Sequence, residues 1–436
     1  MKGRLTAVVL ALTSAVACAD NTSEPDAEEV EDLGQQESEL LTTWGKKSVK
    51  NGKDFLNLGG MAATWSTMGD LDLENEFHTA QGANGRSCAS CHLPEGGWSI
   101  TPLQVEVLFW ATAGQDPIFN PADANTPTSP VANWQERYAS YSMLRKGLFR
   151  RGGTLPATRE FDIVAANDPF GYGSTSRFSV FRRPLATANF HLAKNVSWDD
   201  NNTRNGQTVR QGLFAQADNN IVSGQAGSPP TPETVNAIVD YELALSFAQS
   251  KVPGAGDLDK HGAKGGPKFL SQQAFVAGRF NLFDGWKKDK NKHRAAIARG
   301  QELFNTKTRP DGRGPCLSCH NSENNGSNVA GTVFDIGASD ARWASVDNLP
   351  VYTVKNVSTG EEIQTTDPGK ANRTGRWSDM NKFKVPSLRG LTARAPFFHN
   401  GVAKDLNDVV EFYEKSLGFK YTKAEKEDLV AFLNAL

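Results

Sequence analysis

The chain contains the same five-residue pattern of chemically reactive side chains twice, at residues 88–92 (CASCH) and 316–320 (CLSCH). A Cys-x-x-Cys-His pattern is typical of c-type haem attachment, in which two thiols bond to the haem vinyl groups and the histidine binds the iron from the proximal side. The two intervening residues let both sulfur atoms reach neighbouring vinyl groups, and the adjacent histidine then lies beneath the ring. The sequence therefore predicts two covalent haem c groups, held by Cys88, Cys91 and His92 and by Cys316, Cys319 and His320.

Zinc is the main alternative for these cysteines, because a Cys-x-x-Cys pair also forms half of a tetrahedral zinc site. A redox-active dithiol is a second alternative. Zinc binding would require the two patterns to pool four thiols across more than two hundred residues, and it would leave both adjoining histidines unexplained. Haem attachment explains all six residues and is the preferred interpretation.

Length and charge describe a multi-domain globular protein. The chain has 436 residues, enough for two or three domains with sizeable cores, and a formal net charge of -2. Lysine and arginine are not grouped in blocks, which argues against nucleic acid as a partner. Four of the five cysteines belong to the haem patterns, so the sequence provides no disulfide framework.

The first residues have the pattern of an export signal. Lys2 and Arg4 precede an apolar stretch, residues 5–16, that is too short to span a bilayer as a stable anchor. Small residues precede Cys18, as in a lipoprotein processing site, although they also suit cleavage of an ordinary secreted protein. We expect residues 1–18 to be a signal peptide, and the lipoprotein type is the favoured interpretation. The protein would then lie on the periplasmic side of a bacterial cell envelope, touching the membrane only through a lipid anchor; a soluble periplasmic protein is the alternative.

Composition divides the rest of the chain into four segments. Residues 19–42 are acidic and poor in large apolar side chains, so we expect a disordered tether. Residues 43–255 are predicted to form an N-terminal haem c domain, residues 256–290 a linker rich in glycine and lysine, and residues 291–436 a C-terminal cytochrome c domain. The predicted fold is mostly α, with two cytochrome c-like haem domains and long irregular loops.

Several segments carry a clear secondary-structure pattern. Residues 231–249 and 294–305 have helical periodicity, and a capping box opens a further helix after Thr422. Residues 114–135 contain four prolines and predict a long loop. Residues 161–183 are rich in aromatic side chains and glycine, and they predict irregular structure or short strands.

Residues 383–413 (FKVPSLRGLTARAPFFHNGVAKDLNDVVEFY) resemble the C-terminal signature of the bacterial di-haem cytochrome c peroxidases and of the related methylamine-utilisation di-haem enzyme. In that family F-K-x-P-x-L-R, A-P-[YF]-F-H-[DN]-G and a helix follow the second haem pattern, and all three occur here in order. Residues 183–199 resemble the family's segment between the two haem patterns. The resemblance implies that the C-terminal haem receives electrons and that the N-terminal haem reacts with peroxide or a related oxidant.

The resemblance also implies roles for single residues. Trp198 falls at the position of a tryptophan between the two haems, although a plain core aromatic is the alternative. His399 corresponds to a histidine near the haem interface that does not bind iron, and Gln216 is a candidate for a distal glutamine. Tyr413 falls at the position of the distal ligand of the C-terminal haem, with a buried structural tyrosine as the alternative. Met380 is the competing ligand, because its spacing from the second haem pattern suits an ordinary cytochrome c.

The surroundings of the first haem depart from the family. Leu108 stands where the peroxidases carry a removable distal histidine, and no histidine occurs from 93 to 190. The N-terminal iron is therefore expected to be open at rest, or to be closed by His191 or His261. An insertion at residues 200–207 leaves the family's distal glutamine and glutamate without clear counterparts. Because a general acid-base beside peroxide drives cleavage of its O–O bond, peroxidase activity depends on groups that the sequence does not identify.

Calcium is the third cofactor that the resemblance raises. Arg183 replaces an asparagine of the family's interdomain calcium site, which also uses backbone carbonyl groups around Arg394 and Pro396. A calcium ion is accordingly less expected here than in the family.

The predicted function is that of a di-haem c oxidoreductase resembling cytochrome c peroxidase, with a small redox protein or an oxidisable substrate as electron donor and peroxide as acceptor. Two alternatives remain: a non-catalytic di-haem electron carrier, and a substrate- or protein-oxidising enzyme of the methylamine-utilisation type. Iron coordination discriminates between them, since an open N-terminal iron favours an enzyme and two six-coordinate irons favour a carrier.

Overall fold

The computed structural model describes residues 43–200, 203, 206–272, 278–322, 326 and 333–436. The predicted signal peptide, the predicted tether and Cys18 lie outside these residues. Within them, no helix is long and apolar enough to cross a membrane. Helices account for 34% and strands for 18% of the structure. The predicted mostly α fold is thus only partly observed, because five small sheets accompany the helices in the part of the chain that is described.

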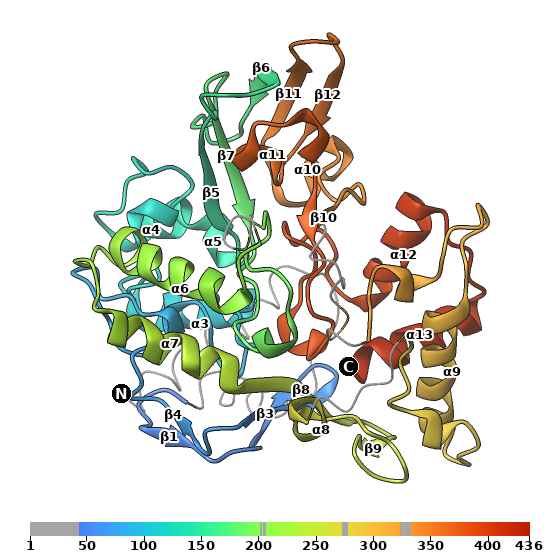
Figure 1. The fold of residues 1–436 in the computed structure, drawn as a ribbon. Coiled ribbons are helices and arrows are strands. Elements are labelled where there is room, and N and C mark those ends of the chain that lie inside the picture. The colour runs from blue at the N-terminus through green and yellow to red at the C-terminus, as the bar shows by residue number, and fades with distance from the viewer. Residues whose placement is uncertain (1–42, 201–202, 204–205, 273–277, 323–325, 327–332) are drawn as a thin grey trace, which may run out of the picture.

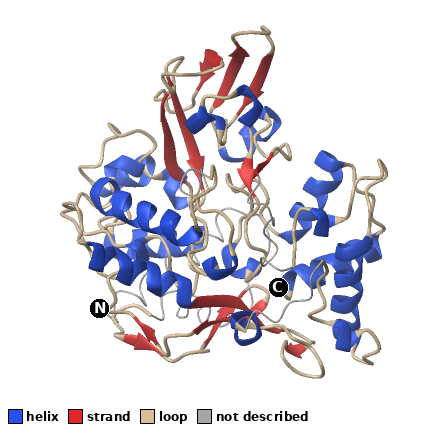
Figure 2. Cartoon of the chain, in the orientation of Figure 1, coloured by secondary structure: helices blue, strands red, loops and turns tan. Residues whose placement is uncertain are grey.

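The longer helices form two groups (Figure 1). The group on the left of the view contains four helices that precede residue 245: α3 (Pro102–Thr112), α4 (Trp134–Ser140), α6 (Val209–Asn219) and α7 (Pro232–Ala244). The group on the right contains α9 (Lys292–Thr306), α12 (Leu406–Leu417) and α13 (Lys423–Asn434). The short helices are α5 (Ser142–Arg145), α8 (Pro267–Ser271), α10 (Ala344–Asp347) and α11 (Ala371–Thr374). Loops occupy much of the region between the two groups (Figure 2).

The strands belong to small antiparallel sheets. The lower sheet has the order β2-β3-β8-β9, with β2 (Asp54–Asn57), β3 (Gly60–Ser66), β8 (Leu245–Val252) and β9 (Gly256–Asp257). The strands that project at the top of Figure 1 are β5 (Phe149–Thr154), β6 (Phe161–Asn167), β7 (Arg177–Arg182), β11 (Val351–Asn356) and β12 (Glu362–Thr365). The remaining strands are β1 (Ser48–Val49), β4 (Leu71–Asp72), β10 (Val333–Phe334) and β13 (Phe383–Lys384).

Helix α7 confirms the start of the helix predicted over residues 231–249 and corrects its end. Thr231 accepts a hydrogen bond from the Thr234 amide at 3.3 Å, as expected of an N-cap, and Pro232 is the first helical residue. The helix ends at Ala244 because the following residues form β8, which pairs with β3 across nearly two hundred residues of sequence. Long-range strand pairing therefore overrides the local helical pattern.

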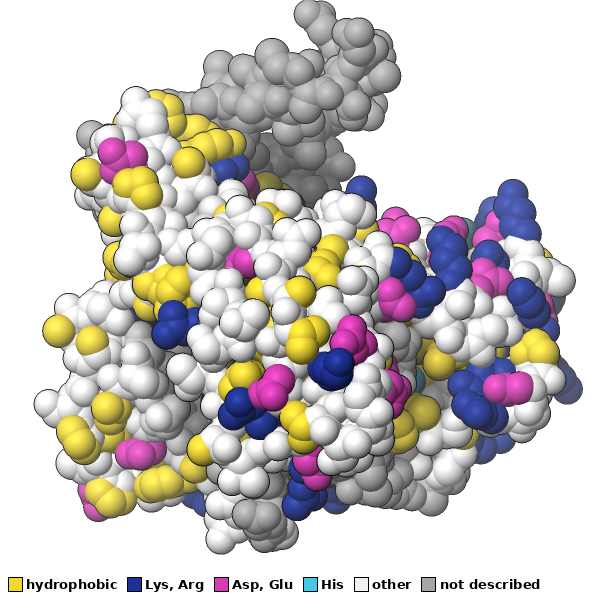
Figure 3. Space-filling model, turned by 90° about the horizontal axis from the view of Figure 1, so that it is seen from above, with side chains coloured by type: hydrophobic (Ala, Val, Ile, Leu, Met, Phe, Trp, Pro, Cys, Tyr) yellow, Lys and Arg dark blue, Asp and Glu magenta, His cyan; other side chains and the backbone are white. Residues whose placement is uncertain are grey.

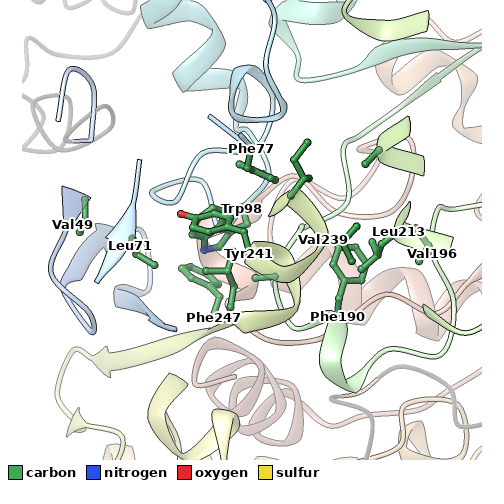
Figure 4. Packing of buried hydrophobic residues seen from close by; sticks show 14 of the residues in the cluster. Val49, Leu71, Phe77, Trp98, Phe190, Val196, Leu213, Val239, Tyr241 and Phe247 are labelled. Atoms are coloured by element: carbon green, nitrogen blue, oxygen red, sulfur yellow. The ribbon is translucent and has the colours of Figure 1, made fainter. Parts of the chain in front are cut away.

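The N-terminal core combines aromatic rings with aliphatic side chains (Figure 4). Trp98, Tyr241 and Phe77 lie together, with ring centroids 5.5 to 5.9 Å apart, and Phe247 of β8 belongs to the same cluster. Cys88 of the first haem pattern packs against this cluster. The core therefore supports the first haem pattern directly.

The C-terminal core lies between α9, α13 and the segment expected to be a linker. A Cβ atom on Gly300 of α9 would collide with the backbone of Asp428 on α13, so glycine allows these helices to cross in close contact. Leu258, Phe283 and Trp286 are buried in the same cluster as the helix side chains. Several described residues of the predicted linker therefore pack as part of the C-terminal core, which its composition did not indicate.

One sheet joins the two halves of the chain. Strand β6 precedes the second haem pattern and β11 follows it, yet they pair antiparallel with Val351 opposite Asn167. Strands β6 and β7 confirm that residues 161–183 include short strands. The predicted division at residues 255 and 291 separates the haem patterns, but this sheet is shared between both sides of it.

Candidate functional site

The second haem pattern begins with a tight turn that brings its reactive groups together. Residues Cys316–Ser318 form one 3-10 turn, and the amide of His320 donates to the Cys316 carbonyl at 3.0 Å. His320 Nδ1 lies 2.7 Å from the Gly326 carbonyl oxygen. This contact assigns the N–H to Nδ1 and leaves Nε2 as an acceptor. Burial lowers the pKa of His320 to about 4, which keeps the ring in the neutral form that binds iron.

An apolar cavity borders these residues. Its wall contains Cys316, Cys319 and His320. Apolar and aromatic side chains of α9, α12 and α13 complete this part of the wall: Phe304, Leu406, Val409, Val410, Leu429 and Leu433. The cysteines are not joined as a disulfide, and burial raises the pKa of Cys316 to about 11, so the thiol stays protonated. Two free thiols, a neutral histidine and an apolar wall are the donor set and surroundings that a covalent haem requires.

Tyr413 also lines this cavity, whereas Met380 does not. Burial raises the pKa of Tyr413, and the Cys316 and Cys319 thiols lie close enough to add to that effect. Met380 belongs to a different buried cluster, which also contains Phe161 and Tyr352 of the sheet of β6 and β11. The residues between the second haem pattern and Met380 include strands β11 and β12. Met380 therefore does not lie in the cavity wall, although its sequence spacing made it a candidate.

The first haem pattern lies between two apolar clusters. Cys88 packs against the core of Trp98 and Tyr241, and Cys91 packs against the cluster of α3 that contains Tyr141. His92 Nδ1 lies 2.9 Å from the Trp98 carbonyl oxygen, and the ring also bonds the backbone near Leu185. Burial lowers the pKa of His92 to about 4 and raises that of Cys91 to about 11. These groups repeat the arrangement of the second pattern and fit a second covalent haem.

A buried ion pair fixes the loop that leads into the first pattern. Arg86 Nη1 lies 2.7 Å from Asp123 Oδ2, and Arg86 Nε donates to the Pro117 carbonyl at 2.9 Å. Arg151 contacts the other carboxylate oxygen of Asp123 at 2.7 Å. Because loss of one partner would leave an uncompensated buried charge, this network holds the predicted long loop against the first pattern.

Glu242 is a buried acid that the sequence analysis missed. Its side chain is 2% exposed, and Oε2 has no hydrogen-bond partner among the described residues. Burial raises the pKa of Glu242 to about 8, and the carboxyl group is close enough to Cys88 to raise the pKa of that thiol. A signal was present in the sequence, because Glu242 continues the apolar stripe of Val235, Ile238 and Val239 at helical spacing.

We expect Glu242→Gln to make the protein more stable than wild type at high pH and to change it little near pH 4. The folded wild type keeps a proton on Glu242 that the unfolded chain releases above about pH 4.5, so its free energy of unfolding should fall as pH rises from about 4.5 to about 8. The slope for one group is about 1.4 kcal/mol per pH unit. Denaturant unfolding of both proteins between pH 4 and pH 9 measures the difference. Parallel stability curves would contradict the burial of this acid.

The cavity of the second haem pattern extends to residues beside the first. Trp198 and His399 line it together, and so do Ser99 and Leu185, which flank the contacts of His92. Trp198 Nε1 donates to the Arg183 carbonyl at 2.8 Å, and its ring centroid lies 6.2 Å from that of His399. The structure therefore brings Trp198 and His399 into one region between the two haem patterns.

His399 is held by neighbours on several sides. Its ring stacks on Phe383 with centroids 3.9 Å apart and an interplanar angle of 17°. Its Nε2 lies 3.4 Å from Ser339 Oγ and 3.8 Å from Asp367 Oδ2, and Asp367 also pairs with Arg182 at 2.6 Å. Burial lowers the pKa of His399 to about 4, so the ring is neutral near pH 7. These contacts fix the position of the His399 ring, as expected of a histidine that orders the region between the haem patterns without binding iron.

Comparisons with known proteins identify the relatives of this arrangement. No family model matches the chain. A cytochrome-c peroxidase of Pseudomonas sp. (strain SCT) is 32% identical over 168 residues, which cover 34% of this chain and 41% of that protein. Cytochrome c551 peroxidase of Nitrosomonas europaea is 31% identical over 156 residues, covering 35% of this chain and 38% of that protein. Methylamine utilization protein MauG of Paracoccus denitrificans is 36% identical over 69 residues, covering 15% and 18%.

The chain is related to the bacterial di-haem cytochrome c peroxidases and to MauG. It matches about two fifths of the length of these peroxidases.

Comparison of this chain with solved structures gives weaker matches. A MauG-like protein associated with microbial copper homeostasis aligns with a TM-score of 0.36 and 18% identity, covering 61% of this chain and 75% of that chain. A variant of the diheme peroxidase BthA from Burkholderia thailandensis aligns with a TM-score of 0.32 and 14% identity, covering 82% and 83%. At TM-scores below 0.5 these alignments do not define the site.

The other residues singled out at the first haem lie as follows. Leu108 is buried in α3, in the cluster that contacts Cys91. His191 Nε2 lies 3.5 Å from Ser246 Oγ, and His261 is exposed in a loop. Gln216 is half-buried on α6. These positions lend no support to His191 or His261 as ligands of the first haem, and they leave Gln216 as a candidate.

A buried arginine, Arg183, and a half-buried arginine, Arg394, line the cavity. Arg183 is 4% exposed, and burial lowers the pKa of Arg394 to about 10. Neither side chain forms an ion pair with a carboxylate among the described residues. Buried positive charge without a negative partner is unfavourable. Both guanidinium groups donate to backbone carbonyl oxygens, which satisfies their hydrogen bonds, and the positive charge that they leave on the cavity wall fits the propionate carboxylates of a haem.

Proposed function

We propose that the protein is a peroxidase-like di-haem c oxidoreductase. The haem of Cys316, Cys319 and His320 receives electrons, and the haem of Cys88, Cys91 and His92 delivers them to peroxide or a related oxidant. The observation that carries this proposal is the cavity whose wall includes both the second haem pattern and Trp198, together with Leu185 and Ser99 beside the first pattern. A continuous site of this kind provides a route for electrons between two redox centres.

The protein's own groups position the reacting parts in this proposal. The haems supply the redox chemistry when bound, and the chain supplies binding, orientation and charge. The bond from the Trp198 indole to the Arg183 carbonyl fixes the ring between the two sites. The neutral ring of His399, stacked on Phe383, packs against Trp198 and restricts its movement.

We further propose that a small redox protein delivers electrons at the C-terminal domain. Lysine and arginine side chains, interspersed with acidic ones, gather on the right-hand part of the surface, where α9, α12 and α13 lie (Figures 1 and 3). Lys415 of α12 and Lys423 of α13 have side chains that are 64% and 92% exposed. A charged surface near the electron-entry haem favours encounter with a redox protein of complementary charge. An oxidisable organic substrate is the alternative donor.

A steady-state assay tests the proposed activity. The purified protein with both haems is mixed with a reduced small c-type cytochrome, and oxidation of the cytochrome is followed with and without hydrogen peroxide. We expect oxidation that depends on both the protein and peroxide. A protein that exchanges electrons with the cytochrome but gives no peroxide-dependent turnover would instead be an electron carrier.

The second candidate function is oxidation of a bulky or protein substrate, as in the methylamine-utilisation type. The position of Tyr413 in the cavity wall favours it, because the family resemblance assigns a tyrosine ligand to that type and a methionine to the peroxidases. We therefore propose Tyr413, and not Met380, as the distal ligand of the second haem.

We expect Tyr413→Phe to change the coordination of the second haem and to leave the first unchanged. Phenylalanine keeps the ring that packs in the cavity but removes the oxygen that binds iron. The second iron should become high-spin or recruit a new ligand, and its low reduction potential should rise, because a phenolate stabilises ferric iron. Electron paramagnetic resonance and a potentiometric titration measure both effects.

Met380→Leu is the matched control for that substitution. Leucine preserves an apolar side chain in the cluster of Phe161 and Tyr352, so the spectra of both haems should stay as in wild type. An absorption band of methionine-ligated iron that survives in Tyr413→Phe and disappears in Met380→Leu would reverse the assignment.

We also propose that the protein functions in the periplasm of a bacterium, anchored through a lipid on Cys18. Support comes from the sequence alone, since Cys18 lies outside the described residues. Mass spectrometry of the mature N-terminus tests the anchor. A chain that begins at residue 18 or 20 without lipid would be a soluble periplasmic protein.

A further inference from the structure

The guanidinium group of Arg183 lies in a cage of backbone carbonyl oxygens. Its Nη2 donates to the carbonyl oxygen of Ile100 at 2.7 Å, of Arg394 at 3.2 Å and of Ala395 at 3.4 Å, and Nη1 donates to that of Gly147 at 3.5 Å. These oxygens belong to three separate parts of the chain: the loop before α3, the turn after α5, and the segment after the second haem pattern. One side chain therefore joins N-terminal and C-terminal segments.

This buried cation is balanced by carbonyl dipoles and not by a carboxylate. Arg183 forms no ion pair with an acidic side chain in the described parts of the chain, and Arg394 adds a second positive charge nearby. Burial is the main cause that lowers the pKa of Arg183, to about 9, with Arg394 lowering it further, so the group remains charged at neutral pH. Several carbonyl oxygens directed at one buried positive charge are also what a hard metal cation such as calcium requires.

The local backbone is shaped for the guanidinium. Gly147 has φ of 70°, and a Cβ atom there would collide with Arg183 Nη1. A glycine is thus needed both for the left-handed turn and for the close approach of the side chain. With the guanidinium in place, these carbonyl oxygens already have a cationic partner, so the calcium ion raised by the family resemblance does not fit here.

We propose that Arg183 is a built-in cation that takes the place of a bound metal ion at this junction and makes the junction independent of calcium. The replacement also has a positioning role. The Arg183 amide donates to the His399 carbonyl at 2.6 Å, and the Arg183 carbonyl accepts from the Trp198 indole at 2.8 Å. Arg183 therefore has two roles: its side chain binds the carbonyl oxygens of the junction, and its backbone holds His399 and Trp198 between the haem sites.

The test uses the protein with both haems bound and the variant Arg183→Ala. We expect the thermal midpoint of wild type to be unchanged by calcium chloride or by a calcium chelator. The alanine variant should unfold on the order of 5 °C lower, because four carbonyl oxygens lose their cationic donor. Millimolar guanidinium or calcium should restore much of that loss, and calorimetry should detect calcium binding to the variant and not to wild type. Sodium chloride of equal ionic strength should restore nothing.

Arg137→Ala is the matched control. Arg137 also donates to three carbonyl oxygens, those of Ala113, Val131 and Ala132, at 2.7, 3.1 and 3.4 Å, but it is only half-buried and all three lie within the N-terminal half. Water can replace its guanidinium, so neither cation should raise the midpoint of this variant.

Two results would overturn the proposal. One is a wild-type midpoint that falls when calcium is removed, and the other is an Arg183→Ala variant that neither cation stabilises. If Arg183→Ala does not fold, Arg183→Lys decides, since it keeps a charge near the carbonyl oxygens. Calcium independence of the lysine variant supports a built-in cation, and calcium dependence contradicts it. These readouts do not involve peroxide, so they are independent of the proposed activity.

Discussion

Cys88→Ala combined with Cys91→Ala is expected to remove one haem and all peroxide-dependent turnover. Each thioether bond needs its own thiol, and the thiols of the second pattern line the cavity, whereas Cys88 and Cys91 pack against the N-terminal apolar clusters. The intact mass should fall by one haem, and turnover should fall to background. The second haem should still be reduced by the donor, because its attachment residues are untouched.

Cys316→Ala with Cys319→Ala is the matched control for that double variant. It should also lose one haem, but it should keep the reaction of the first haem with peroxide while losing the rapid supply of electrons. Two haems retained in either variant would refute the attachment of haem by these cysteines. Peroxide turnover retained in the first variant would move the reactive site to the second haem.

Trp198→Phe is expected to slow electron passage between the two haems by about tenfold or more, equivalent to ~1.4 kcal/mol or more in the barrier. Phenylalanine is harder to oxidise than tryptophan, and it cannot donate the hydrogen bond that fixes the ring to the Arg183 carbonyl. Stopped-flow absorption of the half-reduced protein mixed with peroxide measures the rate at which the second haem is oxidised.

Trp343→Phe controls for general effects of losing an indole. Trp343 is also half-buried and donates to a backbone carbonyl, that of Gly337, at 2.9 Å, but it does not line the cavity. The rate should therefore stay close to that of wild type. Equal rates in Trp198→Phe and wild type would show that electron passage between the two haems does not depend on Trp198.

The parts of the fold and site that depend on short sequence patterns could be predicted. The two haem patterns and the capping box of Thr422 and Glu425 involve residues no more than four apart, and the structure shows that capping box as expected. Tyr413 followed from a resemblance carried by a contiguous segment, and it lies in the cavity wall. Sequence spacing is therefore sufficient to predict a feature whose residues are close together in the sequence.

The parts that depend on distant pairing could not be predicted. Strand β8 replaces the end of a predicted helix because β3 lies beside it, and the sheet of β6 and β11 crosses the predicted domain division. Met380 had suitable spacing, but the strands between it and the haem pattern carry it elsewhere. The carbonyl cage of Arg183 draws on three separated segments, and no sequence pattern records that convergence.

The most direct test of the account is the optical response of the half-reduced protein, in which only the second haem is reduced, to one equivalent of hydrogen peroxide. The account predicts that the second haem loses its reduced spectrum quickly in wild type and does not do so in the Cys88→Ala, Cys91→Ala variant. A second haem that is oxidised at the same rate in both proteins, or in neither, would contradict the assignment of the first haem as the site of peroxide reaction.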